Sequence, residues 1–151
     1  MSDVREDVLG YLETHHVMTL ATHGTQGPWA AAVFYVSNGF TLTFLSSPRT
    51  RHAQDLANEP RCAATIHEDY REWKDIKGVQ LEGRVTTITG IRRIEAIRLY
   101  GEKFPLIRPG QTPALIKAAL SRVTWYELTP TRCFFVNNTK GFGHRDEIPL
   151  T

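Results

Sequence analysis

Residues 45–53 combine hydroxyl and cationic side chains in a spacing that could bind a phosphate ester. The segment leaves a predicted strand and enters a predicted helix. An anion is favoured at a helix N-terminus, because the backbone N–H groups there are unpaired and the helix dipole is positive. We expect Arg51 to bind the phosphate bidentately, and His52 to add charge when it is protonated. The expected hydroxyl donors are Ser46, Ser47 and Thr50. The alternative interpretation is helix capping by Ser or Thr, with the arginines solvated.

The sequence lacks the residue spacings of a metal site and of a nucleophilic or nucleotide-hydrolysing site. The sequence has six histidines, and none is paired with another ligand at H-x-x-x-H or H-E-x-x-H spacing. Neither a G-x-S-x-G motif nor a P-loop is present, so acyl transfer and nucleotide hydrolysis have no support. We therefore predict no metal site and assign no catalytic residue. The neighbours His15 and His16 are interpreted as surface or partly packed residues.

The rest of the chain divides into helices and strands that would position residues 45–53. We expect helices over residues 3–14, 48–58, 90–103 and 112–121, and strands over residues 16–22, 29–36, 40–45, 61–67, 79–88, 124–128 and 133–137. Turn residues lie at 23–28, 37–39 and 129–131. Either Ser2 or Asp3 would cap the first helix, and either Ser47 or Thr50 the second. Most strands are consecutive, which predicts a mainly antiparallel sheet. Six or more such strands favour closure into a small barrel, because closure removes the exposed edges.

The composition is that of an ordinary globular protein. A length of 151 residues predicts one domain over residues 1–151, and 41% hydrophobic with 23% charged residues excludes disordered and fibrous classes. A net charge of +2 gives no reason to expect a nucleic-acid or membrane partner. Cys62 and Cys133 are interpreted as buried small residues in a reducing compartment. The acidic start and the absence of a long apolar run make the cytoplasm the expected location.

The order of several short motifs resembles the FMN-binding split-barrel superfamily, which includes pyridoxamine 5′-phosphate oxidase. The motifs span about residues 8–88 and comprise residues 18–22, 30–35, 44–47, 50–53, 58–61 and 78–83. Residues 125–128 and 137–143 are similar to a smaller, largely uncharacterised bacterial branch. Each motif is weak alone, whereas their order and spacing make the match fairly specific.

The resemblance implies a homodimer that holds two FMN molecules in clefts at the subunit interface. In this superfamily a Ser or Thr at a strand end and an Arg-Lys pair at the next helix bind the phosphate. Leu45, Ser46, Arg51 and His52 fall at those positions. His52 replaces the Lys, which reduces the positive charge near pH 7, and Arg49 would supply what His52 does not.

The flavin-facing strand of the superfamily maps onto residues 30–35. Small side chains at Ala31 and Ala32 would let the backbone approach a flat ring, while Val33, Phe34 and Tyr35 would build walls. This assignment rests on the resemblance alone. The alternative is a barrel strand with no ligand role.

The loop at residues 137–143 is a second candidate site. Its amides and its cation, among them Asn138 and Lys140, would reach across the dimer interface to the polar edge of the flavin. A cation there would stabilise an anionic reduced ring. The alternative is a polar terminal loop with glycine turns. Trp73 and Trp125 are interpreted as packing or dimer-interface aromatics.

Two departures from the oxidase pattern restrict the substrate. Gly78 stands where the oxidases have Gln, and residues 143–145 do not reproduce their R-x-H motif near the C-terminus. Pyridoxamine phosphate oxidation is therefore disfavoured.

The leading functional hypothesis is an FMN-dependent oxidoreductase that acts on an unidentified small-molecule redox partner. Tyr35, His52 and Lys140 are candidates for tuning the flavin only. The second hypothesis is a non-enzymatic flavin- or haem-binding sensor or carrier, and a deazaflavin is an alternative cofactor. The third is an oligonucleotide-binding small barrel, against which the near-neutral charge and the lack of interleaved basic and aromatic residues argue.

Overall fold

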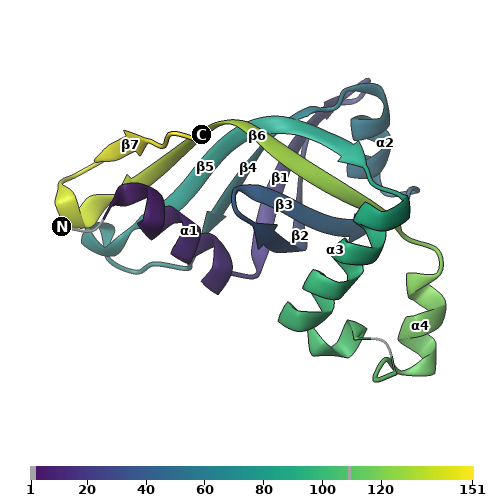
Figure 1. The fold of residues 1–151 in the computed structure, drawn as a ribbon. Coiled ribbons are helices and arrows are strands. Elements are labelled where there is room, and N and C mark those ends of the chain that lie inside the picture. The colour runs from purple at the N-terminus through teal and green to yellow at the C-terminus, as the bar shows by residue number, and fades with distance from the viewer. Residues whose placement is uncertain (1–2, 109) are drawn as a thin grey trace.

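Antiparallel strand pairs close into a barrel, as Figure 1 shows. The computed structural model describes residues 3–108 and 110–151. Among these residues the barrel strands are β1 (Val17–Gly24), β2 (Gly27–Asn38), β3 (Thr41–Ser46), β4 (Arg61–His67), β5 (Lys77–Thr87) and β6 (Thr124–Asn137). They pair in the order β3-β2-β1-β4-β5-β6, and a β3–β6 pairing closes the ring. The predicted mainly β, antiparallel barrel is therefore confirmed. A short strand that was not predicted, β7 (Arg145–Glu147), pairs with β6.

Helices flank the barrel. They are α1 (Val4–Thr14), α2 (Arg51–Asn58), α3 (Gly90–Lys103) and α4 (Ala114–Leu120), with the single turns η1 (Trp73–Asp75), η2 (Pro105–Ile107) and η3 (Asn138–Lys140). Asp3 caps α1 through its side chain, and the alternative cap, Ser2, lies outside the described residues. The two predicted helices that follow the fifth strand are found as α3 and α4.

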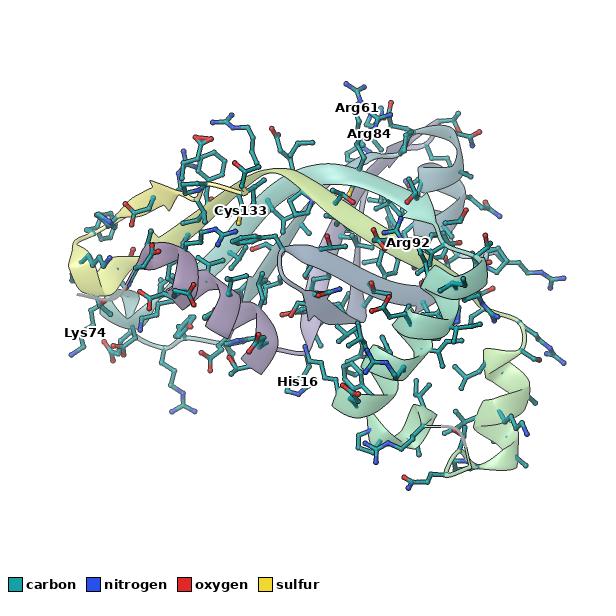
Figure 2. The ribbon with its side chains drawn as sticks, in the orientation of Figure 1. His16, Arg61, Lys74, Arg84, Arg92 and Cys133 are labelled. Carbon is teal, nitrogen blue, oxygen red and sulfur yellow. The ribbon has the colours of Figure 1, made fainter. Side chains whose placement is uncertain are left out.

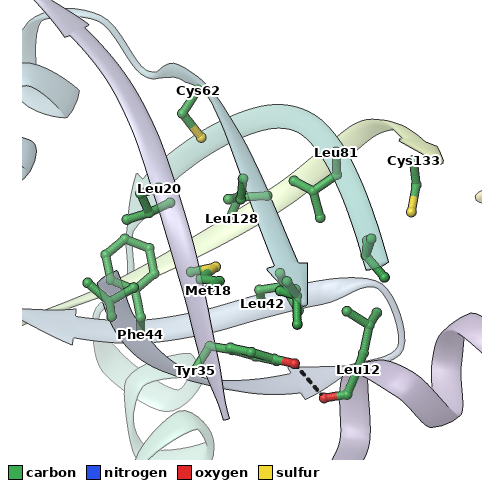
Figure 3. Packing of buried hydrophobic residues seen from close by; sticks show 14 of the residues in the cluster. Leu12, Met18, Leu20, Tyr35, Leu42, Phe44, Cys62, Leu81, Leu128 and Cys133 are labelled. Carbon is green, nitrogen blue, oxygen red and sulfur yellow. Dashed lines mark hydrogen bonds between the residues drawn. The ribbon is translucent and has the colours of Figure 1, made fainter. Parts of the chain in front are cut away.

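Alternate strand residues fill the barrel interior, as a strand periodicity of two requires. Figure 3 shows this core, in which the fully buried side chains include Leu12, Met18, Leu20, Tyr35, Leu42, Phe44 and Leu128. The Tyr35 hydroxyl donates a 2.7 Å hydrogen bond to the Leu12 carbonyl, so the core also fixes α1. Cys62 and Cys133 are buried and unpaired, and burial raises the pKa of each thiol to about 11. Both therefore behave as small apolar residues, as predicted.

The structure corrects the break predicted at residues 129–131. The two expected strands are one strand, β6, and the β5–β6 register shifts between Glu82 and Gly83. Pro130 pairs with Gly83 at this irregularity, where a residue without an N–H donor is tolerated. A Cβ on Gly83 would overlap with the Thr129 carbonyl and lie 2.9 Å from the Pro130 Cα. Glycine is therefore required where the strands approach.

One further expectation differs in detail. The turn predicted at residues 23–28 is shorter, because β1 continues to Gly24 and β2 begins at Gly27, whose φ is 98°.

The apolar side chains of α3 are only partly buried. Ala96 and Tyr100 pack with Trp125, while Ile91 and Ile94 are exposed.

Candidate functional site

The start of α2 brings most of the residues predicted to bind phosphate to one place. The helix expected over residues 48–58 begins at Arg51, because the Thr50 N–H donates to the Ser47 carbonyl and forms a turn before it. Thr50 is the N-cap, and its Oγ1 accepts a 3.3 Å hydrogen bond from the Ala53 N–H. The Ser47 Oγ accepts from the Arg49 N–H at 3.3 Å. The structure thus decides the open choice of cap in favour of Thr50.

The helix is held against the β1–β2 end of the barrel. Thr22 donates a 2.9 Å hydrogen bond to Asp55, and both side chains are buried. A Cβ on Gly24 would overlap with the Asp55 carboxylate, so the β1 backbone approaches the helix closely there. These contacts fix the orientation of the α2 N-terminus relative to β2.

His52 is turned inward rather than toward solvent. Its Nε2 lies 2.6 Å from the Ser46 Oγ and 3.3 Å from the Thr50 Oγ1. Burial lowers the pKa of His52 from its usual value near 6.5, and Asp55 partly opposes this shift. His52 is therefore neutral at pH 7 and supplies no positive charge to an anion. The cations of this site are Arg49 and Arg51.

Arg51 is only weakly engaged by the protein. Its guanidinium carbon lies 4.3 Å from the centre of the Trp29 ring, and one terminal nitrogen donates a 3.4 Å hydrogen bond to the Gln26 carbonyl. Its Nε is buried and has no hydrogen-bond partner among the described residues. Buried donors are nearly always paired in folded proteins. Arg51 therefore retains an unused donor beside the start of a helix, and a phosphate oxygen would satisfy that donor.

Part of one edge of β2, along residues 27–34, has no strand partner among the described residues. β3 pairs with β2 only from Tyr35 to Asn38, whereas β1 pairs with it from Gly27 to Phe34. The Tyr35 N–H donates to the His16 carbonyl on the β1 side, so by alternation the even-numbered residues direct their backbone groups to the open side. The Phe34 carbonyl there accepts a 3.4 Å hydrogen bond from the Tyr100 hydroxyl. The backbone groups of Ala30 and Ala32 meet no strand on this side within the described residues.

The side chains predicted to face a flavin ring divide between two surfaces. Val33 and Tyr35 belong to the buried core, and Tyr35 is engaged by the Leu12 carbonyl. Ala32 and Phe34 are exposed, and Ala31 is half-buried. The expectation that Tyr35 and Val33 form walls of a ring site is therefore wrong, because alternation along the strand turns both side chains inward. Their backbone groups face β1, so they do not point to the open side of β2 either. Leu45 is half-buried and packs against the Trp125 cluster.

The loop at residues 137–143 lies far from α2 in the same chain. Figure 1 shows η3 and β7 at one end of the barrel and α2 at the other. Asn138 is buried, and its side chain donates to the Trp73 carbonyl at 2.8 Å and accepts from the Gly143 N–H at 3.1 Å. The amide therefore holds the loop together. Lys140 is exposed. One chain does not bring these two residues to the phosphate-binding segment.

A groove of about 560 Å³ that does not include the start of α2 is lined by three histidines. Its walls include His15, His16, Val17, His67 and Glu68. The His67 Nδ1 lies 3.0 Å from the Glu68 carbonyl, which can only accept, so Nδ1 carries the proton and Nε2 has a free lone pair. His15 is stacked on Tyr11 and bonded to the Tyr11 carbonyl, while His16 is exposed. His67 therefore holds the tautomer suited to ligating a metal through Nε2. No cluster of three or more His, Cys, Asp or Glu side chains in the described residues could hold a metal ion.

Sequence reasoning missed two residues of this region. Trp29 supports the Arg51 guanidinium, and Tyr100 closes the β2 edge at Phe34. The only signal for Trp29 was an aromatic residue at the start of an apolar strand. Nothing in the sequence pairs Tyr100 with Phe34, because 66 positions separate them.

Comparison with known proteins gives one family. The family model described as pyridoxamine 5′-phosphate oxidase matches residues 4–137. A UPF0306 protein of Enterobacter sp. strain 638 is 31% identical over 137 residues, which cover 89% of this chain and 89% of that protein. A UPF0306 protein of Photorhabdus laumondii is 30% identical over 137 residues, with 89% and 88% covered.

Solved structures share the fold at lower identity. A haem-binding protein from Mycobacterium smegmatis superposes with a TM-score of 0.78 at 22% identity over 99% of this chain, which spans only 59% of that protein. HutZ, the haem storage protein of Vibrio cholerae, superposes with a TM-score of 0.70 at 20% identity over 85% of this chain and 91% of its own. At these identities the likeness shows the fold alone. No helix in the described part of the chain is long and apolar enough to cross a membrane.

Proposed function

Because the chain belongs to the pyridoxamine 5′-phosphate oxidase family, we propose that it binds FMN and acts as an oxidoreductase on a small-molecule redox partner. Membership confirms the resemblance that the motif order indicated. The observation that carries the proposal is the start of α2, where the buried Nε of Arg51 has no partner within the described residues. A phosphate ester supplies the acceptor that this donor lacks.

The residues around the start of α2 would bind the phosphate in different ways. Arg51 and Arg49 supply the positive charge, and the α2 N-terminus supplies backbone donors. Ser47 and Thr50 line the same turn. His52 has a positioning role, since it orients the Ser46 hydroxyl through the 2.6 Å contact.

We place the flavin ring of the proposed FMN against the open edge of β2. The backbone groups of Ala30 and Ala32 would hydrogen-bond its polar edge, and their short side chains leave room for close approach. Bound FMN supplies hydride or electron transfer, which no side chain of this protein provides by itself. The family also leaves a deazaflavin as an alternative cofactor. Extraction of the native cofactor and its identification by mass distinguishes these two.

A second copy of the chain would complete the site. The η3 turn, which contains Lys140, lies with β7 at the opposite end of the barrel from α2, so only a second copy could bring a Lys140 to the flavin. A cation near the ring favours its anionic reduced form.

Titration of the purified protein with FMN and with riboflavin tests cofactor binding. We expect FMN to bind at least tenfold more tightly, because only FMN carries the phosphate. Anaerobic addition of NADH or NADPH to the flavin-loaded protein then tests turnover. Bleaching of the yellow colour supports an oxidoreductase, whereas persistent oxidised absorption supports a carrier.

The second candidate function is haem binding, and the groove at His67 favours it. The Nε2 of His67 would be the group that holds a haem iron, and the two structural relatives named above are described as a haem-binding and a haem storage protein. Titration with haemin tests this function. A sharp Soret band that is lost in His67→Ala, with FMN binding unchanged, would favour haem as the ligand.

A further inference from the structure

Large aliphatic side chains are exposed on the helical arm, which we define as residues 90–108 and 110–122. The arm contains α3, η2 and α4 and projects from the barrel at the lower right of Figure 1. Ile91, Ile94, Leu106 and Leu115 are 53–84% exposed. Every side chain of η2 and α4 is exposed or half-buried. A surface that gathers side chains of this kind marks an interaction site.

The helical arm is also the basic part of the chain. Residues 90–122 have seven Lys or Arg against two Glu, a net charge of +5. The rest of the chain has eleven Lys or Arg against fourteen Asp or Glu, a net charge of −3. The overall charge of +2 averages these two regions, which is why composition alone gave no reason to expect a membrane partner. The charge of the arm itself favours an anionic partner.

Several cations of the arm have no carboxylate of their own. Glu95 and Glu102 both pair with Arg98, at 4.0 and 2.7 Å. Both acidic residues of the arm are therefore used by a single arginine. The exposed cations that make no ion pair within the described residues are Arg93, Lys117 and Arg122. These three side chains are available to anionic groups outside the chain.

An apolar groove of about 500 Å³ runs along α3 but covers only part of this surface. It is lined by Ile94, Ile97, Arg98, Gly101, Glu102 and Arg108. Ile91 and Leu115, which are 83% and 84% exposed, do not line it. A partner helix seated in the groove would therefore leave the two most exposed side chains of the arm in water. The partner must instead contact side chains from three separate elements.

We propose that the helical arm binds to the surface of an anionic membrane. Lys and Arg are attracted to the lipid headgroups, while aliphatic side chains insert at the boundary between headgroups and acyl chains. A fluid lipid surface adapts to side chains that α3, η2 and α4 present separately. A nucleic acid fits less well, because the large apolar side chains exposed on the described part of the arm are all aliphatic and offer no ring for base stacking. The proposal does not depend on the flavin site.

Co-sedimentation of the flavin-free protein with lipid vesicles tests the proposal. One set of vesicles is pure phosphatidylcholine, and the other contains equal parts of phosphatidylcholine and phosphatidylglycerol. We expect binding to the mixed vesicles to be about tenfold tighter or more, because only these are anionic. Added salt should weaken this binding, since it screens exposed charges.

Two variants with equal losses of charge separate the arm from the rest of the surface. The arm-charge variant is Arg93→Gln, Lys117→Gln and Arg122→Gln, and the control variant is Arg71→Gln, Lys74→Gln and Arg84→Gln; all six side chains are exposed. Figure 2 shows Lys74 and Arg84 away from the arm. One basic residue near an anionic surface strengthens binding about fivefold, so the arm-charge variant should bind the mixed vesicles on the order of 100-fold more weakly. The control variant should stay within about twofold of wild type.

A third variant, Ile91→Gln with Leu115→Gln, tests insertion of the aliphatic side chains. We expect it to bind the mixed vesicles about tenfold more weakly and to keep the salt dependence of wild type. Circular dichroism establishes that each variant folds.

Three outcomes would overturn the proposal. The first is a wild-type protein that does not bind the mixed vesicles, or binds both kinds equally. The second is an equal loss in the arm-charge and control variants, which would report net charge only. The third is weaker self-association of the arm-charge variant in sedimentation velocity without vesicles, which would mean that a second copy covers the arm. FMN titration of the same samples tests the proposed function separately.

Discussion

Replacing Arg51 by Gln separates recognition of the phosphate from the stability of the fold. In the protein the Arg51 side chain stacks on Trp29 and makes one long hydrogen bond of 3.4 Å to the Gln26 carbonyl. Its Nε makes none within the described residues. The substitution therefore removes little that stabilises the folded state, and we expect unfolding free energy to fall by less than about 1 kcal/mol.

The same substitution should weaken FMN binding far more. A hydrogen bond between a guanidinium and a phosphate contributes about 1.5–3 kcal/mol. This corresponds to an FMN dissociation constant about 10- to 150-fold higher. Riboflavin lacks the phosphate, so its dissociation constant should change less than about twofold.

Quenching of flavin fluorescence during titration of the apoprotein measures both constants, and urea unfolding measures stability. Arg84→Gln is the matched control, since Arg84 is an exposed arginine near the same end of the barrel, as Figure 2 shows. Equal losses for FMN and riboflavin would mean that Arg51 acts on the ring or on the fold. An unchanged FMN constant would remove Arg51 from the site and refute the reasoning from its unpaired donor.

Three further predictions concern stability. Burial lowers the pKa of His52, so between its folded pKa and about 6.5 the unfolded chain binds more protons, and stability should fall as the pH drops through this range. The difference in melting temperature between pH 7 and pH 5 should be smaller for His52→Gln than for wild type, and an equal difference would contradict this reasoning. Gly83→Ala should lower the unfolding free energy by about 2 kcal/mol or more, because the Cβ overlaps with the Thr129 carbonyl. Gly10→Ala, with no atom within 4 Å of the new Cβ, should raise it by about 0.5–1 kcal/mol, and similar urea midpoints for these two variants would contradict the packing argument. Tyr35→Phe should lower the unfolding free energy, measured with urea, by about 1 kcal/mol, because it removes the 2.7 Å hydrogen bond to the Leu12 carbonyl. An unchanged unfolding free energy would mean that this hydrogen bond does not stabilise the folded state.

Local sequence patterns were sufficient for most of the fold. Strand alternation and turn residues predicted where most strands lie and that the sheet is mainly antiparallel, and the bounds of β4 and α3 were predicted to the residue. A strand's period of two and a helix's period of 3.6 are properties of neighbouring residues, so they can be read along the chain. Pro130 misled the prediction, because whether a proline ends a strand depends on the partner strand. Here Gly83 opposite it allows a bulge.

The sequence alone also located the candidate site, since Ser46, Thr50 and Arg51 lie within one strand-to-helix connection whose chemistry is local. Only the tertiary structure decided what each side chain does there. Packing against Ser46 makes His52 a neutral positioning residue, and Trp29 rather than an acidic group supports Arg51. The open edge of β2 and the distance of Lys140 from α2 were likewise invisible in the sequence. Both depend on how the barrel closes, and closure is set by contacts between residues that the chain order keeps far apart.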